Sequence, residues 1–451
     1  MFRLSVIALV GCGGAAAPIA RAAQQGDPVG PHRAMVAAQI QPLLDAELVN
    51  GIVVGIYEVG RPEIYGFGKG PGGKPPDGGT LFELGAVTKV YTGLLLADSV
   101  QRKEVDLDGP VAELLPPGVT APTRDKTAIT VRELAVHSAG LPAQPPSLGT
   151  GPDPYARYGE NELYHDLVRT QLVTRPGERI LYSDYGFGLL GHVLGRKIGS
   201  GYAAALGERV LKPLALADTF VRVPPASQPR RATGTNEDLA PVPPWTYDAL
   251  AGAGGLVSTA RDQLAFIAAQ VDANAGSRGV LRPAMRLTQE TQLESRGDNE
   301  GLGWQIDTAG RYWHSGATGG FHSFIGFDPK TRRGLVVLAA TNTALVDQIA
   351  ARLYRLLANE AVKPLAFPDA QQLAAYVGAY DFGGSRLEIS RAGKRLYIEG
   401  PGEPKFRMVP ISEREFWIER LQAIVTFERD GDQIKRAIFI VGEKQLSAPR
   451  L

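Results

Sequence analysis

The chain has 451 residues and 44% hydrophobic content, so it exceeds one ordinary domain and can bury a substantial core. Its formal net charge of +1 gives no general electrostatic argument for nucleic acid or for an acidic partner. The single cysteine, Cys12, excludes a disulfide within the chain, and a core of this size does not need one for stability.

The first 22 residues have the pattern of an export signal. A short basic start, Met1–Arg3, precedes an apolar run and an alanine-rich stretch, which predicts cleavage after Ala22. The run is too short and glycine-broken to be a transmembrane helix, and no later apolar run is long enough to cross a bilayer. Lipoprotein processing at Cys12 ranks second, because it leaves only eleven residues of signal. We therefore expect an exported, periplasmic protein.

The first half of the chain mixes helical and strand patterns. Residues 32–48 predict a helix, and Gly51–Tyr57, rich in valine and isoleucine, predicts a buried strand. A helix beginning near Gly85 continues through Val90–Val100. Residues 140–142 (Gly-Leu-Pro) then break the helical pattern, and the proline and glycine loop that follows is of a kind that often lines a substrate cleft.

Further on, helix and strand signals again alternate. Thr259 and Asp262 have capping-box spacing at the start of a helix. Phe324–Phe327 and Leu335–Ala340 predict adjacent strands, followed by a closing helix at Leu345–Leu357.

The composition changes after Ala361. Residues 361–372 contain two prolines and predict a linker, followed by a short helix through Leu373. Short alternating segments with glycine-marked turns then predict a small antiparallel barrel or curled sheet over residues 373–451. No catalytic cluster occurs there, so we expect it to serve packing, homo-oligomer assembly or the shape of the cleft rim.

The most informative segment is FELGAVTKVYTGLLLADSV, in which Lys89 stands three residues after Ala86. On a helix these positions share one face about one turn apart, the placement that a hydroxyl and a lysine base need for proton exchange. The segment resembles the active-site helix of the penicillin-recognising serine hydrolases, namely class C β-lactamases, DD-peptidases and esterase relatives, which read S-x-x-K there. Alanine supplies no hydroxyl.

Two further motifs strengthen the resemblance. Tyr182-Ser183-Asp184 resembles the Y-x-N element of that family, and residues 314–316 (His-Ser-Gly) resemble its K-T-G element in the H-x-G form. The stretches ITVRELAVHSAGLP, AGAGGLVSTARDQLAFI and GLGWQ follow in family order. The resemblance implies an α+β domain over 23–360, with an antiparallel sheet flanked by helices and a helical subdomain. YVGAYDFGG resembles the start of the lipocalin-like domain appended to some members.

The resemblance also implies the catalytic roles. Position 86 is the seat of the nucleophile, Lys89 is the base, Tyr182 relays a proton, and His314 acts from the opposite side of the cleft. The structural alternatives are a strand histidine bonded to a backbone carbonyl for His314 and a core aromatic for Tyr182. His137 and His322 are interpreted as structural. The resemblance implies no cofactor, and the histidines and the cysteine show no metal-ligand spacing.

Four positions are expected to contact substrate: Asp184, Ser315, Gly316 and Gly319. Asp184 departs from the family asparagine, because an ionised carboxylate only accepts hydrogen bonds and favours a protonated lysine, which is a poor base. The substrate class stays open between β-lactams, peptidoglycan peptides with D-amino acids, and esters.

Neither neighbouring hydroxyl replaces the missing nucleophile in this interpretation. Thr88 is roughly 200° round the helix from position 86, and Ser183 lies between motif positions. Two hypotheses remain for Ala86: a hydrolase whose nucleophile was replaced, or a natural pseudoenzyme that binds acylated or peptidoglycan-like ligands without turnover. The presence of Lys89, Tyr182 and His314 favours the first.

Overall fold

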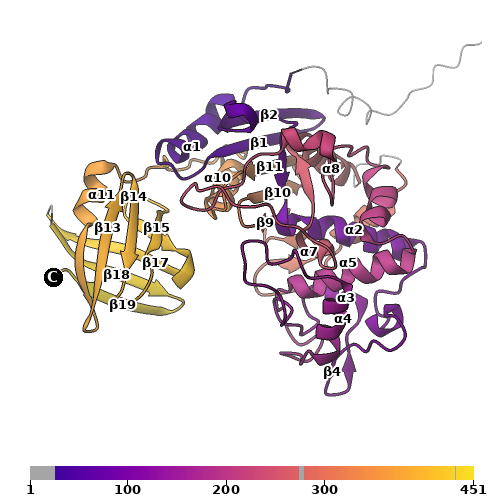
Figure 1. Ribbon diagram of the computed structural model, residues 1–451. Coiled ribbons are helices and arrows are strands. Elements are labelled where there is room, and N and C mark those ends of the chain that lie inside the picture. The colour runs from indigo at the N-terminus through magenta and orange to yellow at the C-terminus, as the bar shows by residue number, and fades with distance from the viewer. Residues whose placement is uncertain (1–25, 274–278, 432) are drawn as a thin grey trace, which may run out of the picture.

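The computed structural model describes residues 26–273, 279–431 and 433–451, and it divides into two domains (Figure 1). The predicted export signal, with Cys12, lies outside the described residues. None of the helices in the described part of the chain is long and apolar enough to cross a bilayer.

The larger domain is built on a seven-stranded antiparallel sheet in the order β2-β1-β11-β10-β9-β8-β7. The segments predicted as adjacent strands pair as β10 and β11, and the N-terminal strand β1 joins β11. The strands are β1 (Gly51–Glu58), β2 (Arg61–Gly68), β7 (Asn299–Glu300), β8 (Gln305–Ile306), β9 (Tyr312–Ala317), β10 (His322–Asp328) and β11 (Arg333–Ala339).

Helices cover both faces of this sheet (Figure 1). Helix α1 (Arg33–Asp45) and the closing helix α10 (Leu345–Leu357) pack on one face, and α8 (Ala260–Ala273) packs on the other. Strand β1 is buried on both sides because its alternate side chains enter the two cores, as the predicted buried strand requires. Helix α1 is shorter than predicted, since Glu47 adopts a left-handed conformation just beyond it.

The helical subdomain surrounds α2 (Thr88–Gln101), which follows a 3₁₀ turn at Gly85–Val87 and is buried from Thr88 to Ser99. The other helices are α3 (Val131–Ala135), α4 (Glu160–Arg169), α5 (Asp184–Ile198), α6 (Tyr202–Leu206), α7 (Ala251–Gly254) and α9 (Arg282–Gln289). Two short ladders complete this domain: β3 (Leu81–Glu83) with β6 (Val257–Thr259), and β4 (Thr123–Arg124) with β5 (Thr127–Ala128). The arrangement is the α+β fold expected from the sequence.

The C-terminal domain is an eight-stranded antiparallel sheet that nearly closes into a barrel, because Tyr380 on its first strand bridges Arg450 after its last. Helix α11 (Ala370–Tyr376) precedes it and begins within the segment predicted as linker. The strands are β12 (Gly378–Phe382), β13 (Ser385–Ala392), β14 (Arg395–Glu399), β15 (Phe406–Pro410), β16 (Glu415–Ile418), β17 (Ala423–Asp430), β18 (Gln433–Val441) and β19 (Lys444–Pro449).

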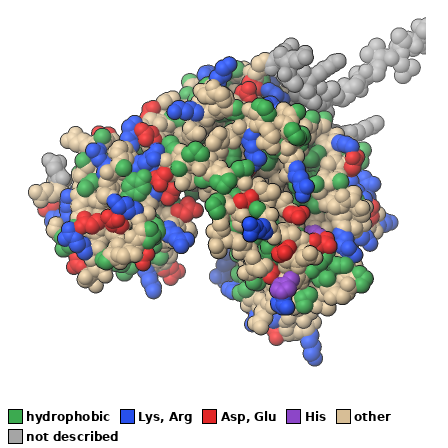
Figure 2. Space-filling view, viewed as in Figure 1, with side chains coloured by type: hydrophobic (Ala, Val, Ile, Leu, Met, Phe, Trp, Pro, Cys, Tyr) green, Lys and Arg blue, Asp and Glu red, His purple; other side chains and the backbone are tan. Residues whose placement is uncertain are grey.

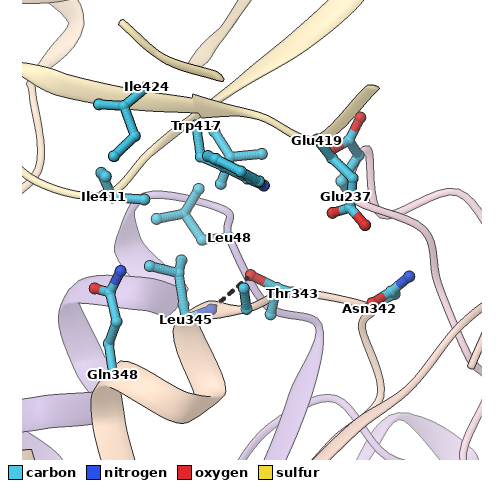
Figure 3. Close-up of a pocket in the computed structure, with 12 residues that line it drawn as sticks. Leu48, Glu237, Asn342, Thr343, Leu345, Gln348, Ile411, Trp417, Glu419 and Ile424 are labelled. Carbon is cyan, nitrogen blue, oxygen red and sulfur yellow. Dashed lines mark hydrogen bonds between the residues drawn. The ribbon is translucent and has the colours of Figure 1, made fainter. Parts of the chain in front are cut away.

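The two lobes are separated by a notch below their contact (Figure 2). A cavity of about 190 Å³ lies between them, with apolar side chains from both domains and the carboxyl groups of Glu237 and Glu419 at one end (Figure 3). Nearby, Tyr397 Oη donates to Asp238 Oδ1 at 2.7 Å, and Arg407 Nη1 donates to the same oxygen at 2.9 Å. The barrel therefore contacts a loop of the larger domain through partly buried polar contacts.

Candidate active site

Strand β9 and the turn before α2 meet backbone to backbone. A Cβ on Gly316 would lie 2.3 Å from the carbonyl oxygen of Leu84 and 2.5 Å from the amide nitrogen of Ala86, so only glycine allows this approach. Gly85 has a φ of +50°, and a Cβ there would lie 2.6 Å from the carbonyl oxygen of Ala317. The backbone of the third motif therefore lies directly against position 86.

Lys89 is the electrostatic centre of the site. Its buried Nζ donates to Asp184 Oδ1 at 2.6 Å and to the carbonyl oxygen of Ala253 at 2.9 Å. Burial alone disfavours the ammonium, but the Asp184 carboxylate, helped by Tyr182, outweighs it and raises the pKa of Lys89. Lys89 is therefore a protonated ion-pair partner at neutral pH, as the sequence predicted for an aspartate at position 184.

Tyr182 lies beside this ion pair. Its ring centroid is 4.9 Å from Lys89 Nζ and 4.3 Å from the ring of His137, and 42% of the residue is exposed. Desolvation of the phenol raises the pKa of Tyr182, and Lys89 only partly opposes that rise. Tyr182 is not a core aromatic, and at neutral pH it carries its proton.

His314 lies on β9, and its Nδ1 is 2.6 Å from the carbonyl oxygen of Ser315. Because a carbonyl oxygen only accepts, Nδ1 carries the proton and Nε2 is left as the acceptor nitrogen. Burial, reinforced by the charge of Lys89, lowers the pKa of His314 to about 3. His314 therefore makes the backbone contact of the structural alternative, yet it remains a neutral imidazole near the ion pair.

The two neighbouring hydroxyl groups are committed elsewhere. Thr88 is buried and its Oγ1 accepts from the backbone nitrogen of Leu256 at 3.0 Å. Ser183 caps α5 by accepting from the nitrogen of Gly186 at 2.9 Å, and it donates to the carbonyl oxygen of Pro142 at 2.7 Å. Both hydroxyl groups are therefore engaged by backbone groups, and the expectation that neither acts as a nucleophile stays a prediction.

His137 has a larger part in the site than its structural interpretation suggested. Besides stacking on Tyr182, its Nδ1 accepts from the backbone nitrogen of Ser183 at 3.0 Å, which orients the second motif. It comes from the segment ITVRELAVHSAGLP, and its position just before the Gly-Leu-Pro break was the available signal.

The loop after that break also reaches the site. Gln144 Nε2 donates to Asp184 Oδ2 at 2.6 Å, and the carbonyl oxygen of Pro152 accepts from Trp245 Nε1 at 2.9 Å. A Cβ on Gly319 would lie 2.8 Å from that indole nitrogen. Tyr155 lies behind Trp245, with ring centroids 5.2 Å apart. No motif pointed to these aromatic residues, because their proximity arises only from folding.

Comparison with known proteins assigns the larger domain. The sequence model of the family described as Beta-lactamase matches residues 36–360, which is more than half of the chain. The chain belongs to the Beta-lactamase family. This family membership confirms the resemblance to penicillin-recognising serine hydrolases and makes the larger domain a serine-hydrolase domain.

Individual members of the Beta-lactamase family are similar at moderate identity. A Beta-lactamase of Escherichia coli (strain K12) is 29% identical over 346 residues, covering 68% of this chain and 88% of that protein. A Beta-lactamase of Yersinia enterocolitica is 26% identical and covers 67% and 85%. A D-alanyl-D-alanine-carboxypeptidase/endopeptidase, AmpH, of Escherichia coli (strain K12) is 25% identical and covers 57% and 70%.

Proposed function

We propose that this domain is a serine-hydrolase site for acyl transfer from β-lactams, D-amino-acid peptides or esters, and that it is inactive or strongly impaired because Ala86 occupies the position of the nucleophile. The observation that carries the proposal is the position of Ala86, one residue into the turn before α2, against Gly316 of β9 and on the helical face of Lys89. In family members a serine hydroxyl at this position would attack the acyl carbonyl.

The protonation states limit what the site does even with a hydroxyl at position 86. Lys89 is held as an ammonium by Asp184, and Tyr182 is held as a neutral phenol, so neither accepts a proton readily. This ion pair favours a second candidate function, a natural pseudoenzyme that binds acylated or peptidoglycan-like ligands. In that case the site differs from a catalytic one at two positions, Ala86 and Asp184.

Two substitutions separate these functions. Ala86→Ser restores the hydroxyl, and Ala86→Ser with Asp184→Asn also removes the carboxylate that holds the Lys89 proton. We expect measurable ester or cephalosporin hydrolysis from the single variant. The double variant should hydrolyse the same substrates about tenfold or more faster than the single variant, since a general base contributes roughly 10²–10⁴-fold. Ala370→Ser is the matched control, because it adds the same hydroxyl at an exposed position on α11, in the barrel domain and outside the site.

The assays are hydrolysis of a p-nitrophenyl ester and a chromogenic cephalosporin, with intact-protein mass spectrometry for an acyl adduct. Turnover by the Ala86→Ser variants, with none by Ala370→Ser, supports the disabled hydrolase. A complete lack of turnover and adduct in both Ala86→Ser variants would point to the pseudoenzyme.

We also propose that residues 1–22 export the chain to the periplasm. Fractionation of cells that express the full chain tests this, with deletion of residues 2–22 as the control. Recovery of both forms in the cytoplasm would refute export.

A further inference from the structure

Among the residues that the structure describes, the cations at the site are already paired and are not free to bind a substrate carboxylate. Lys89 is fully buried, and its Nζ is already engaged by Asp184 and the carbonyl oxygen of Ala253. The charges that shift the pKa of His314 are those of Lys89 and Asp184, which are paired with each other. Both β-lactams and peptides ending in a D-amino acid carry a carboxylate close to the bond that is cleaved. Such a group would lose its water here without gaining a counterion.

The third motif is neutral where positive charge would be needed. His314 is an uncharged imidazole at neutral pH, since burial lowers its pKa to about 3. Beside Trp245, Arg231 Nη2 donates to Glu83 Oε1 at 2.5 Å, and the same oxygen accepts from the backbone nitrogen of Trp245 at 3.2 Å. The Arg231 side chain is 17% exposed and its charge is already neutralised by this buried carboxylate, so it is not a free counterion for a ligand.

A buried acid, Glu300, also acts on the second motif. Glu300 on β7 is 6% exposed, and it acts electrostatically on Tyr182. Burial raises the pKa of Glu300 to about 8, with Asp298 adding to the rise, and no cation in the described part of the chain opposes it. Glu300 is therefore mostly a neutral acid at pH 7 and supplies neither a counterion nor a full negative charge to the site.

The site instead presents aromatic surface. Tyr182 is 42% exposed beside Lys89, and Trp245 is partly exposed beside Gly319 of the third motif. Behind Trp245, Tyr155 and Tyr247 stack with their ring centroids 4.1 Å apart, which fixes the loops that carry them. Rings held in this way contribute contact area at little entropic cost.

We infer that the site selects neutral esters with an aromatic group and discriminates against acyl compounds that carry a carboxylate next to the scissile bond. This inference rests on the proposed acyl-transfer site and names its substrate class. In a chain with the serine hydroxyl restored, that oxygen bonds to the ester carbonyl carbon and the alcohol leaves with the hydroxyl proton. Water then hydrolyses the acyl-serine to the free acid.

Binding to the unaltered chain tests the selection without requiring turnover. The probes are N-phenylacetylglycine methyl ester, N-phenylacetylglycine and N-acetylglycine methyl ester, titrated at neutral pH by ligand-observed NMR. We expect the aromatic ester to bind about tenfold or more tightly than either of the others. Equal or tighter binding of the carboxylate, or no saturable binding of the aromatic ester, would overturn the inference.

Paired tryptophan variants locate the binding. Trp245→Leu should weaken binding of the aromatic ester about fivefold or more and leave the weak binding of N-acetylglycine methyl ester unchanged. Trp417→Leu is the matched control, since Trp417 lines the cavity between the domains (Figure 3) and should have no effect. The reverse result would place the ester in the interdomain cavity and refute the assignment.

Kinetics of the Ala86→Ser chain separate this inference from the proposed function. Saturable binding of the aromatic ester without any turnover supports the proposed ligand selectivity and contradicts the proposed acyl-transfer function. A kcat/KM for the cephalosporin that equals or exceeds that for p-nitrophenyl phenylacetate supports acyl transfer and refutes the selectivity.

Discussion

The ion pair between Lys89 and Asp184 gives the sharpest stability prediction. The Lys89 side chain is fully buried and that of Asp184 is 23% exposed, so Asp184→Asn leaves an ammonium in the interior without its counterion. Removing one partner of a buried pair costs about 3–5 kcal/mol. The cost has a ceiling, because the lysine can instead lose its proton. From its ordinary pKa of 10.5, that loss costs about 5 kcal/mol at pH 7.

We expect Asp184→Asn to lower the free energy of unfolding by about 3 kcal/mol at neutral pH, since the introduced amide oxygen still accepts one hydrogen bond from Lys89. The pH dependence follows from the direction of each shift. In the parent the folded pKa of Lys89 is raised, so its contribution is complete below the ordinary value and is lost only as pH rises through the raised pKa. In the variant burial acts alone and lowers that pKa. The unfolding free energy of the variant then increases with pH between neutrality and the ordinary lysine pKa, so the difference in unfolding free energy between parent and variant becomes smaller.

The assay is urea unfolding followed by far-UV circular dichroism, at about pH 7 and about pH 9.5. The helical signal reports mainly on the larger domain, because α11 is the one α-helix that the described residues place in the barrel domain. Asp108→Asn is the control, since it breaks an exposed pair with Arg132 and should cost under about 1 kcal/mol. Equal stabilities of parent and Asp184→Asn at pH 7, or a gap that does not change with pH, would refute the reasoning.

Two further substitutions test the architecture around the site. Gly316→Ala places a Cβ 2.3 Å from the Leu84 carbonyl oxygen and should destabilise the domain by about 1–3 kcal/mol in urea unfolding. Gly207→Ala is the control, because its Cβ would meet nothing within 4 Å and should leave stability almost unchanged. Equal effects of the two substitutions would contradict the close approach of β9. Glu237→Gln tests the interdomain contact. Burial, with Glu419 adding to it, raises the pKa of Glu237 from its ordinary value of 4.5 to about 7. The parent should therefore lose stability as pH rises from 4.5 towards 7, and the variant should not. Limited proteolysis of the linker across that pH range checks the second prediction, and identical profiles would contradict it.

The local patterns in the sequence predicted much of the fold. The alternation and helical spacing around β1, α2, β10, β11 and α10 correspond to elements at nearly the predicted positions. Such patterns report burial, which depends on neighbours within one or two turns or along one strand. The short helix α11 extends into the predicted linker, where an aspartate cap at Asp369 starts it. Its periodicity is too brief to set the boundary from the sequence.

The sequence motifs alone single out Ala86, Lys89, Tyr182, Asp184 and His314, because short spacings determine which residues share a helical face or strand edge. The catalytic and substrate roles of these residues remain predictions. Their protonation states depend on tertiary contacts. Asp184, 95 positions from Lys89, determines that the lysine is charged, and the carbonyl of Ser315 determines the tautomer of His314.

The sequence by itself determined the family, the order of the two domains and the alanine three residues before Lys89, since each depends on residue types at short separations. The tertiary structure alone decided that Trp245 lies beside Gly319, that Gln144 holds Asp184, and that Arg407 of the barrel contacts Asp238 of the larger domain. These contacts join loops far apart along the chain, and no local periodicity encodes them. Charge balance and aromatic surface at the site therefore became visible only once the loops were folded together.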